Sequence, residues 1–405
     1  MNERICVEAA VGGITAPKGI RASGVACGIK PSGLDLALIA PDRSAAAAAV
    51  FTTNRAQAAP VLLSREHLAA SGGRAAAILV NSGCANACTG EGGWDVARDA
   101  AAEVSAQVGC RPQDVLVAST GVIGVALDGR KVAQGIQAAH AALHAAGHAD
   151  AARAIMTTDP FPKERAARVD TPAGSFTVGG MAKGSGMIDP RMATMIAVLA
   201  TDAQVESSLL QDALREVVDM TFNAITVDGE CSTNDCVFLL ATGASGVTVD
   251  GASRPALVQG LLAVCQPLAR DIVRGGEGAT KLMTVAVTGA ASADEAKRAA
   301  RTIANSPLCK TAVHGGDPNW GRFVAAAGRA GVAFDLQRAG VWFGSIELFR
   351  HGRPHDDRAS EAAHYLRRPE IDIRVDLGTG GRGEALVWTC DLSADYVRIN
   401  AEYRT

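Results

Sequence analysis

Short apolar runs alternate with stretches of helical periodicity over the first two-thirds of the chain, and this alternation limits the fold more than any other feature. Short runs bounded by turn residues are typical of buried strands, whereas apolar residues at helical spacing indicate helices that cover a sheet. The pattern therefore predicts a mixed, layered α/β architecture. We expect strands at Leu36–Ala40, Ala76–Val80 and Val115–Ala118, and helices at Trp94–Val108, Lys131–Ala146, Leu209–Phe222 and Ala256–Val273.

The last part of the chain has a different texture, with more strands and fewer long helices. A chain of 405 residues is too long for one ordinary core. We predict a main layered α/β domain over residues 1–280 and a smaller α+β domain over residues 281–405. Within the smaller domain we expect strands at Leu282–Val287, Gly340–Phe349, Ile371–Leu377 and Glu384–Cys390, and a charged helix at Ala293–Ile303.

Composition and charge exclude several classes of protein. Hydrophobic residues make up 48% of the chain and charged residues 20%, which is globular composition, although alanine-rich stretches such as Ala45–Val50 add little buried area. A net charge of −3 gives no broad basic surface, so we expect no nucleic-acid partner. No apolar run approaches the ~20 residues that cross a bilayer, and the first residues lack the order of a signal peptide. We expect a cytoplasmic protein with no membrane partner.

The ten cysteines predict free thiols and no metal site. Disulfides are rare in long intracellular chains. Cys84 and Cys88 form one close pair, and Cys231 and Cys236 form another, but neither has a second pair at zinc spacing.

One segment, residues 180–200, departs from ordinary helix and strand texture. A glycine-rich turn containing Lys183 leads through Pro190 into an apolar run that begins at Thr194. One interpretation is a loop followed by a buried strand or helix, with Thr194 as a cap or a packed hydroxyl. The other is that the chain cuts its own bond between Ala193 and Thr194. The freed α-amine, with an ordinary pKa of about 7.7–8.0, would then serve the threonine hydroxyl as its base.

A nucleophile of this kind needs donors for the oxyanion that forms during acyl transfer. The best candidate is Ser119–Gly124, directly after the apolar run Val115–Ala118, where a strand end that turns on glycine exposes backbone N–H groups. Thr120 could add its hydroxyl. Because Ser-Thr-Gly turns are common, this motif alone does not separate the two interpretations.

Seven sequence blocks, in a fixed order from residue 51 to the C-terminus, point to a family. They are Phe51–Arg55 with Ala58–Pro60, Asn81–Gly83 with Ala85–Ala87, Ser119–Gly124, Ile155–Asp159, Lys183–Met195, Asn319–Arg322 and Tyr396–Thr405. With these blocks the sequence resembles the ornithine acetyltransferase family of arginine biosynthesis nearly end to end.

The resemblance implies a layered αββα-like sandwich of the self-processing N-terminal nucleophile type. It implies autocatalytic cleavage into an α chain, Met1–Ala193, and a β chain, Thr194–Thr405, with Thr194 as the nucleophile. It further implies that Thr120 and Gly121 hold the oxyanion and that the C-terminal tail returns to the active site. The substrate-binding residues that it implies are Thr157, Lys183, Thr194, Glu277, Asn400 and Thr405.

The activity implied by the resemblance is ping-pong acetyl transfer from N2-acetyl-L-ornithine to L-glutamate. Lys183 could pair with the α-carboxylate that both substrates carry, and Glu277 with the side-chain amine of ornithine. The protein itself carries the acyl group, so no cofactor is expected, and the family suggests a heterotetramer of two α and two β chains. Some members also take acetyl-CoA as donor, and the sequence leaves that point open.

Two alternatives of other kinds are a self-cleaved hydrolase, which would release the acyl group to water, and a non-catalytic binding protein. One block also departs from the family, which usually has Asp-Thr where this chain has Glu230-Cys231. Exchange of threonine for cysteine replaces a good hydrogen bonder with a weak one. This departure could alter packing or substrate preference near the site.

Overall fold

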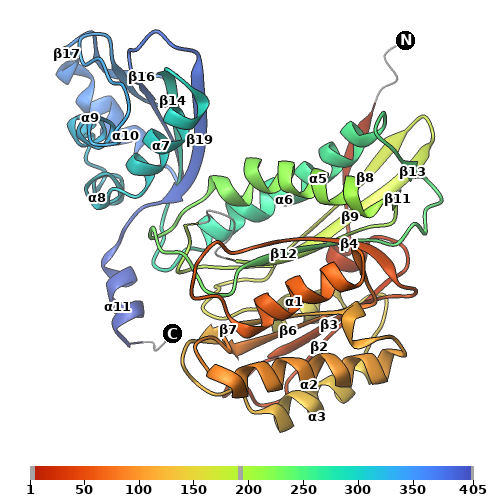
Figure 1. Ribbon diagram of the computed structural model, residues 1–405. Coiled ribbons are helices and arrows are strands. Elements are labelled where there is room, and N and C mark those ends of the chain that lie inside the picture. The colour runs from red at the N-terminus through yellow and green to blue at the C-terminus, as the bar shows by residue number, and fades with distance from the viewer. Residues whose placement is uncertain (1–4, 190–194, 403–405) are drawn as a thin grey trace. The chain divides into compact units, whose positions relative to one another are not determined.

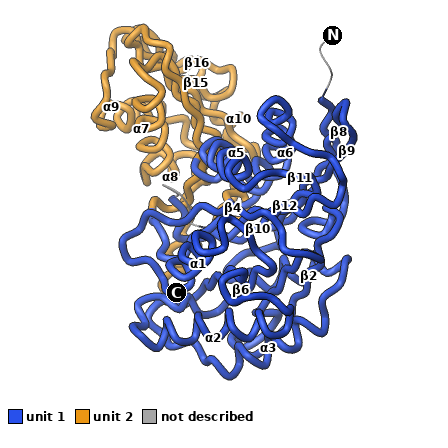
Figure 2. Tube along the Cα trace, turned by 45° about the vertical axis from the view of Figure 1, so that its right-hand side comes forward, with its two compact units in different colours: residues 1–223, 230–272, 405 blue, residues 224–229, 273–404 orange. Residues whose placement is uncertain are grey.

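The computed structural model describes residues 5–189 and 195–402, and the chain divides into two compact units (Figure 2). The first unit comprises the chain up to residue 223 together with residues 230–272. The second comprises residues 224–229 and the chain from residue 273 onward. The domain boundary that the sequence predicts at residue 280 falls inside the second unit.

Two sheets form the centre of the first unit (Figure 1). The larger is a mixed seven-stranded sheet in the order β1-β8-β9-β10-β12-β4-β5, and the smaller has four strands in the order β2-β3-β6-β7. Their bounds are β1 Cys6–Ala10, β8 Lys163–Thr171, β9 Gly174–Lys183, β10 Ile196–Thr201, β12 Cys236–Ala241, β4 Ala45–Phe51, β5 Arg74–Ala75, β2 Ile20–Val25, β3 Leu36–Pro41, β6 Ala77–Cys84 and β7 Val115–Val122, and a two-stranded ribbon pairs β11 Gln204–Val205 with β13 Thr248–Val249.

The main core lies between these two sheets. Ile39 and Val80 of the smaller sheet belong to the same buried cluster as Val198 and Phe238 of the larger one. All six residues of β3, β10 and β12 are buried, as expected of strands covered on both faces. Continuous apolar strands of this kind produced the sequence signal.

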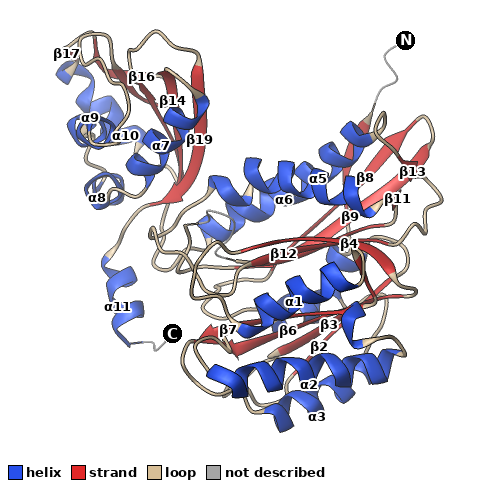
Figure 3. Ribbon diagram, in the orientation of Figure 1, coloured by secondary structure: helices blue, strands red, loops and turns tan. Residues whose placement is uncertain are grey.

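Helices cover the outer face of each sheet, which completes four layers and confirms the predicted layered sandwich (Figure 3). Gly260 of α6 lies against Val169 and Phe176 of the larger sheet, and α2 and α3 share a buried cluster with the smaller one. The helices are α1 Ala59–Ala70, α2 Gly90–Val108, α3 Gly129–Ala141, α4 His148–Ala154, α5 Ser207–Met220 and α6 Arg254–Arg274, with 3₁₀ turns at Gly13–Thr15, Pro112–Asp114 and Phe222–Ala224. By length and composition α6 could cross a membrane, but 67% of its most apolar stretch is buried in the fold.

The second unit is a six-stranded sheet in the order β17-β16-β15-β18-β14-β19 with helices packed on it. Met283 and Val285 of the sheet share its core with Ile303 and Phe323 of two helices. The bounds are β14 Leu282–Ala290, α7 Ala293–Ala304, α8 Pro307–Gly315, α9 Trp320–Gly328, β15 Gly340–Phe343, β16 Ile346–Arg350, β17 Arg353–Pro354, a 3₁₀ turn at Asp356–Arg358, α10 Ala359–Tyr365, β18 Glu370–Asp376, β19 Gly383–Cys390 and α11 Ala394–Glu402.

The structure differs from two sequence-based expectations about elements and resolves a third. The single strand expected at Gly340–Phe349 is wrong, because the chain turns at Gly344, whose φ of 59° is left-handed, and forms the hairpin β15–β16. The helix expected to reach Ala146 ends at Ala141. The apolar run after Thr194 is the strand β10, which settles the choice between strand and helix that the sequence leaves open.

Candidate active site

The parallel strands β6 and β7 of the first unit place the predicted oxyanion residues side by side with a second glycine. Thr120 pairs with Ser82, and Gly121 pairs with Gly83. Gly121 has a φ of 127°, and a Cβ on it would lie 2.4 Å from the carbonyl carbon of Gly83. Only glycine fits this position, because any side chain would meet backbone. The strand β7 runs through Val122, so Thr120 and Gly121 lie near its end and not in a turn after it.

The buried side-chain amide of Asn234 fixes the peptide plane between Ser119 and Thr120. The side-chain N–H of Asn234 donates to the Ser119 carbonyl at 2.8 Å and also to the Ala85 carbonyl. Ser119 Oγ in turn donates to Asn81 Oδ1 at 2.6 Å. Since a peptide unit is planar, a fixed Ser119 carbonyl also fixes the opposite direction of the Thr120 N–H. Asn234 is therefore a positioning residue for the candidate oxyanion site, and the sequence reasoning did not assign it this role.

Lys183 links this strand end to the larger sheet. It is the last residue of β9, it pairs with Ile196 at the start of β10, and its side chain is buried. Its ammonium donates to Thr120 Oγ1 at 3.1 Å. Two residues that lie far apart in the sequence, and that were predicted to share one site, are therefore in direct contact.

Asp159 is a buried carboxylate that interacts with the charges of Lys163 and Lys183. It accepts Lys163 Nζ at 2.6 Å, the Gly184 N–H at 2.7 Å and the Thr157 N–H at 3.1 Å. Burial alone would raise the pKa of Asp159, but the charges of Lys163 and Lys183 and these hydrogen bonds hold it below its ordinary value. Asp159 thus positions two predicted substrate-binding residues, Thr157 directly and Lys183 through the next residue.

A second buried carboxyl, Asp235, has the opposite character. It immediately precedes β12, whose first residue, Cys236, donates its N–H to the Met195 carbonyl. Burial raises the pKa of Asp235 well above its ordinary range, although the charge of Lys183 opposes this. Its Oδ2 has no hydrogen-bond partner among the described residues. A buried carboxyl group with a raised pKa therefore lies next to the residue that bonds the Met195 carbonyl.

The residues that depart from the family pattern lie near the same loop. Cys231 forms an isolated bridge with Ile188, and its Sγ is 3.7 Å from Thr52 Oγ1. Asn54 Nδ2 donates to the Cys231 carbonyl at 2.8 Å. Glu230 is exposed. The side-chain departure at Cys231 therefore affects its contact with Thr52, whereas the bridge to Ile188 is made by the backbone.

In the second unit, Glu277 and Asn400 are brought together. Glu277 is 7% exposed in the loop after α6, and Asn400 on α11 donates its side-chain N–H to Glu277 Oε2 at 2.8 Å. Two further contacts hold α11 on the same part of the unit, from Ser393 Oγ to the Gly278 carbonyl and from the Tyr396 hydroxyl to Asp228. These contacts hold α11 beside the loop that carries Glu277.

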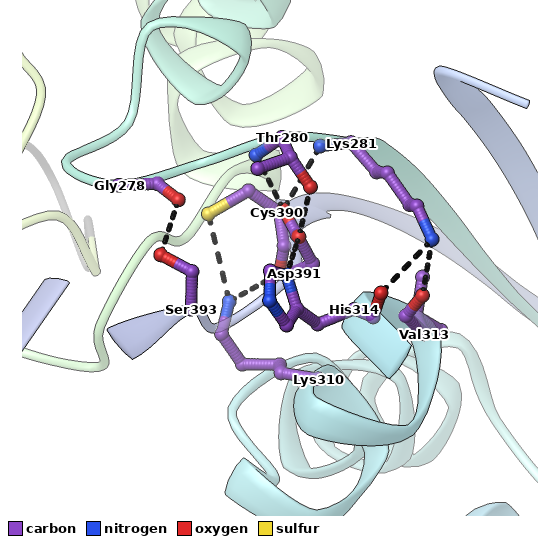
Figure 4. Close-up of polar contacts among 9 residues, drawn as sticks. All are labelled: Gly278, Thr280, Lys281, Lys310, Val313, His314, Cys390, Asp391 and Ser393. Atoms are coloured by element: carbon purple, nitrogen blue, oxygen red, sulfur yellow. Dashed lines mark hydrogen bonds and ion pairs between the residues drawn. The ribbon is translucent and has the colours of Figure 1, made fainter. Parts of the chain in front are cut away.

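Buried Asp391 anchors the chain just before α11 (Figure 4). It accepts the N–H groups of Thr280 and Lys281 at 2.8 and 2.9 Å, the Thr280 hydroxyl, and His314 Nδ1 at 2.7 Å. Burial would raise the pKa of Asp391, but these hydrogen bonds hold it below its ordinary value. The anchor fixes where α11 starts, and with it the position of Asn400 beside Glu277.

Ala193, Thr194 and Thr405 lie outside the described residues, so the predicted cleavage bond and nucleophile have no structural account here. Thr120, Gly121, Thr157 and Lys183 lie in the first unit, and Glu277 and Asn400 in the second. Among the described residues, no group of three or more His, Cys, Asp or Glu side chains could hold a metal ion.

The four-layer first unit places this protein in the class of layered α/β sandwiches. A sequence profile of the ArgJ family matches residues 21–405. The chain is 48% identical over 400 residues to the arginine biosynthesis bifunctional protein ArgJ of Symbiobacterium thermophilum, and this match covers 97% of the chain and 99% of the relative. The chain belongs to the ArgJ family, and it is an acyltransferase of arginine biosynthesis.

Two solved structures are also similar at 40% sequence identity. The crystal structure of the arginine biosynthesis bifunctional protein ArgJ from Bacillus halodurans covers 50% of this chain and 96% of its own, with a TM-score of 0.48. The ornithine acetyltransferase from Mycobacterium tuberculosis, solved with ornithine, covers 46% of this chain and all of its own, with a TM-score of 0.43.

Proposed function

We propose that the chain cuts itself between Ala193 and Thr194 and then transfers an acetyl group from N2-acetyl-L-ornithine to L-glutamate through an acetyl ester on Thr194. The observation that carries the proposal is the 3.1 Å contact from the Lys183 ammonium to Thr120 Oγ1. It places a cation suited to a substrate carboxylate beside the backbone that would hold an oxyanion. Lys183 also pairs with Ile196, two residues after Thr194 in sequence.

The chemistry runs in two stages on one hydroxyl. In the first, Thr194 Oγ attacks the Ala193 carbonyl carbon and the C–N bond breaks, which turns the amide into an ester and frees the Thr194 amine; water then hydrolyses the ester to release the Ala193 carboxylate and restore the Thr194 hydroxyl. In the second, the hydroxyl gives its proton to that amine and attacks the acetyl carbonyl of acetylornithine, and the amine passes the proton to the departing ornithine nitrogen. The α-amine of glutamate then attacks the acetyl-Thr194 ester, which restores the hydroxyl.

We assign each remaining site residue to one group of the substrates or of the reaction. We assign Thr120 and Gly121 to the oxyanion, Lys183 to the α-carboxylate common to both substrates, and Thr157 to the wall of the site. We assign Glu277 to the side-chain ammonium of ornithine. Asn400, which donates to Glu277 Oε2, would hold that carboxylate in place, with Thr405 completing the set.

Further parts of the proposal concern donors, assembly and location. The similar ArgJ of Symbiobacterium thermophilum is named a bifunctional protein, which supports acetyl-CoA as a second acetyl donor to glutamate. The acyl carrier is a side chain of the protein, so the reaction requires no cofactor. We propose that two α and two β chains form a heterotetramer in the cytoplasm, and a molecular mass near twice 41.4 kDa in solution would support it.

Thr194 variants and intact-protein mass spectrometry test the proposal together. The wild-type protein should migrate on a denaturing gel as two fragments of nearly equal length, the second with an N-terminal threonine. Incubation with acetylornithine should add one acetyl group to that second fragment. Thr194→Ser keeps a hydroxyl and should still process, whereas Thr194→Ala should stay intact and inactive. Active wild-type protein that is uncut at this bond would refute the proposal.

Steady-state kinetics separate transfer from hydrolysis. With acetylornithine and glutamate as varied substrates, double-reciprocal plots should give parallel lines, because the acetyl group rests on the enzyme between two half-reactions. Release of acetate at the same rate with and without glutamate would identify a hydrolase. A chain that binds acetylornithine but forms neither product would be a binding protein.

A further inference from the structure

A buried carboxylate shapes the loop between β2 and β3 and determines where Lys30 is presented. Asp35 is fully buried and accepts three backbone N–H groups, from Cys27 and Ile29 at 2.7 Å each and from Lys30 at 3.0 Å. Hydrogen bonds to a charged acceptor are stronger than those between neutral groups. The backbone at Lys30 is therefore held rigidly, as is typical of loops that support a binding residue.

The Lys30 side chain extends from this loop over the candidate oxyanion strands. A Cβ on Gly83 would lie 2.7 Å from Lys30 Cγ, and Gly83 is the residue that pairs with Gly121. At its far end, the Lys30 ammonium donates to the Met156 carbonyl at 3.0 Å, next to Thr157. Both ends of the side chain therefore lie against residues adjacent to predicted site residues. An ammonium has three donors, and the Met156 carbonyl takes one of them.

The charges around Lys30 leave an excess of positive charge. Burial lowers the pKa of Lys30, the carboxylates of Asp35 and Asp159 raise it, and the nearby charge of Lys183 lowers it again. Asp159 also forms an ion pair with Lys163, so three ammonium groups face two carboxylates in this part of the unit. Burial raises the pKa of Asp235, so this carboxyl offsets the excess less than an exposed carboxylate would. A half-buried surplus cation of this kind favours an anionic ligand group.

The two proposed substrates differ in the number of carboxylates that they carry. Acetylornithine has one, the α-carboxylate, whereas glutamate has an additional one on its side chain. We propose that Lys30 is a specificity-determining residue that supplies the positive charge for the second carboxylate of the glutamate acceptor, while Lys183 pairs with the α-carboxylate. This inference rests on the proposed function and adds to it the residue that selects a dicarboxylate over a neutral analogue.

The test compares glutamate with glutamine as acetyl acceptors, because glutamine keeps the shape and loses the side-chain charge. In a ping-pong reaction kcat/KM for each acceptor reports the second half-reaction alone. Lys30→Met should lower kcat/KM for glutamate by about tenfold to a hundredfold, the effect expected for one hydrogen bond to a charged group. It should leave glutamine, and acetylornithine in the first half-reaction, within about threefold. Lys30→Arg should retain most of the preference for glutamate.

The matched control is Lys131→Met. Lys131 is exposed on α3 and its ammonium donates to the Gly28 carbonyl at 2.7 Å, so it supports the same loop from outside the charge cluster. This variant should keep the wild-type ratio of glutamate to glutamine. The ratio does not depend on the fraction of folded enzyme, so partial misfolding of Lys30→Met does not obscure the result.

Three outcomes would overturn the assignment of Lys30. They are an unchanged ratio in Lys30→Met, an equal loss in both half-reactions, and the same fall in the ratio for Lys131→Met. Failure of the proposed function is recognised separately, because the wild-type enzyme would then form no acetyl adduct on Thr194 and no acetylglutamate.

Discussion

A buried aspartate in each unit helps to position residues predicted to bind substrate, Asp159 in the first and Asp391 in the second, but the two aspartates have different partners. Asp159 in the first unit accepts a lysine ammonium and two backbone N–H groups, and the side chains of both Asp159 and Lys163 are completely buried. Asp391 in the second unit accepts two backbone N–H groups, a threonine hydroxyl and a histidine ring. The negative charge of Asp159 is balanced mainly by a lysine charge. The negative charge of Asp391 is stabilised by N–H and O–H dipoles and by an imidazole.

The lysines show the same contrast. In the second unit, Lys281 Nζ donates to the carbonyls of Val313 and His314 at the end of α8. Buried Lys310 donates to Thr389 Oγ1 at 3.0 Å and to the Cys390 carbonyl. These lysines therefore hold elements of the second unit together through hydrogen bonds to neutral acceptors. The lysines around Asp159 create a surplus of positive charge at strand ends, which suits the binding of carboxylate substrates.

The largest effect is expected from Asp159→Asn. This change keeps the shape of the side chain and an oxygen that can accept the N–H groups, but it leaves Lys163 buried with no counter-charge. Loss of one partner of a buried ion pair costs about 3–5 kcal/mol. Urea denaturation should show the loss of stability. Hydrogen–deuterium exchange with mass spectrometry should place the loss of protection in β8 and β9 and not in the second unit.

A rescue and a control complete this experiment. The double variant Asp159→Asn/Lys163→Met should recover much of the lost stability, because it removes the uncompensated charge. Asp170→Asn removes the partner of Arg168 in an exposed ion pair on the same hairpin and should cause no measurable change. If the double variant is no more stable than Asp159→Asn, the buried charge is not the cause and the contrast between the two units fails.

A smaller effect is expected from Asp391→Asn. The amide oxygen can still accept hydrogen bonds, but these bonds are no longer strengthened by a negative charge. The amide NH2 group also faces donors that it cannot accept. We therefore expect the unfolding free energy to fall by about 1–3 kcal/mol. Exchange should rise in β19 and α8. Since the pKa of Asp391 is lowered in the folded state, its contribution is complete above the ordinary carboxyl pKa, about 4, and is lost as the pH falls through the lower folded pKa.

The pH dependence gives this prediction its own check. The difference in unfolding free energy between wild type and Asp391→Asn should be constant near pH 7 and should shrink as the pH is lowered below about 4. A difference that stays the same into the acid range would show that geometry, and not the charge of Asp391, stabilises this part of the second unit.

The sequence predicted several elements that carry a continuous apolar signal, although it missed one of them, β12, and it also missed elements that depend on tertiary context. The runs at Leu36–Ala40 and Val115–Ala118 are strands, and Trp94–Val108 lies in a helix. Ala45–Val50 was discounted as adding little buried area, yet it lies within β4, between β12 and β5. There, α5 packs on the strand, and Gln211 bonds both the N–H and the carbonyl of Ala49. Small side chains allow this close packing, and no local pattern reveals it.

The candidate site divides in the same way. The motifs identified Thr120 and Lys183, and the structure places their side chains in contact. The sequence reasoning assigned no role to Lys30, which lies in an ordinary polar loop and reaches Met156 only through the fold. Asn234 was likewise missed, because its value depends on the Ser119 carbonyl, 115 positions away. Motifs identify residues whose chemistry is unusual, whereas positioning residues have ordinary chemistry in a particular place.

The smallest effect is expected from Lys310→Met, which tests the second unit's side of the contrast. Methionine has a similar length, so the change removes a buried charge together with its hydrogen bonds to Thr389 and the Cys390 carbonyl, and these two consequences oppose each other. The Thr389 hydroxyl, which loses a donor, keeps its own acceptor, the Ala304 carbonyl at 3.3 Å. Because no opposite charge is stranded, we expect a change in unfolding free energy below about 1.5 kcal/mol. Lys297→Met on the exposed face of α7 serves as the control for loss of a lysine charge. A loss as large as that of Asp159→Asn would mean that the second unit also depends on a buried ion pair, with Asp391 as the counter-charge of Lys310.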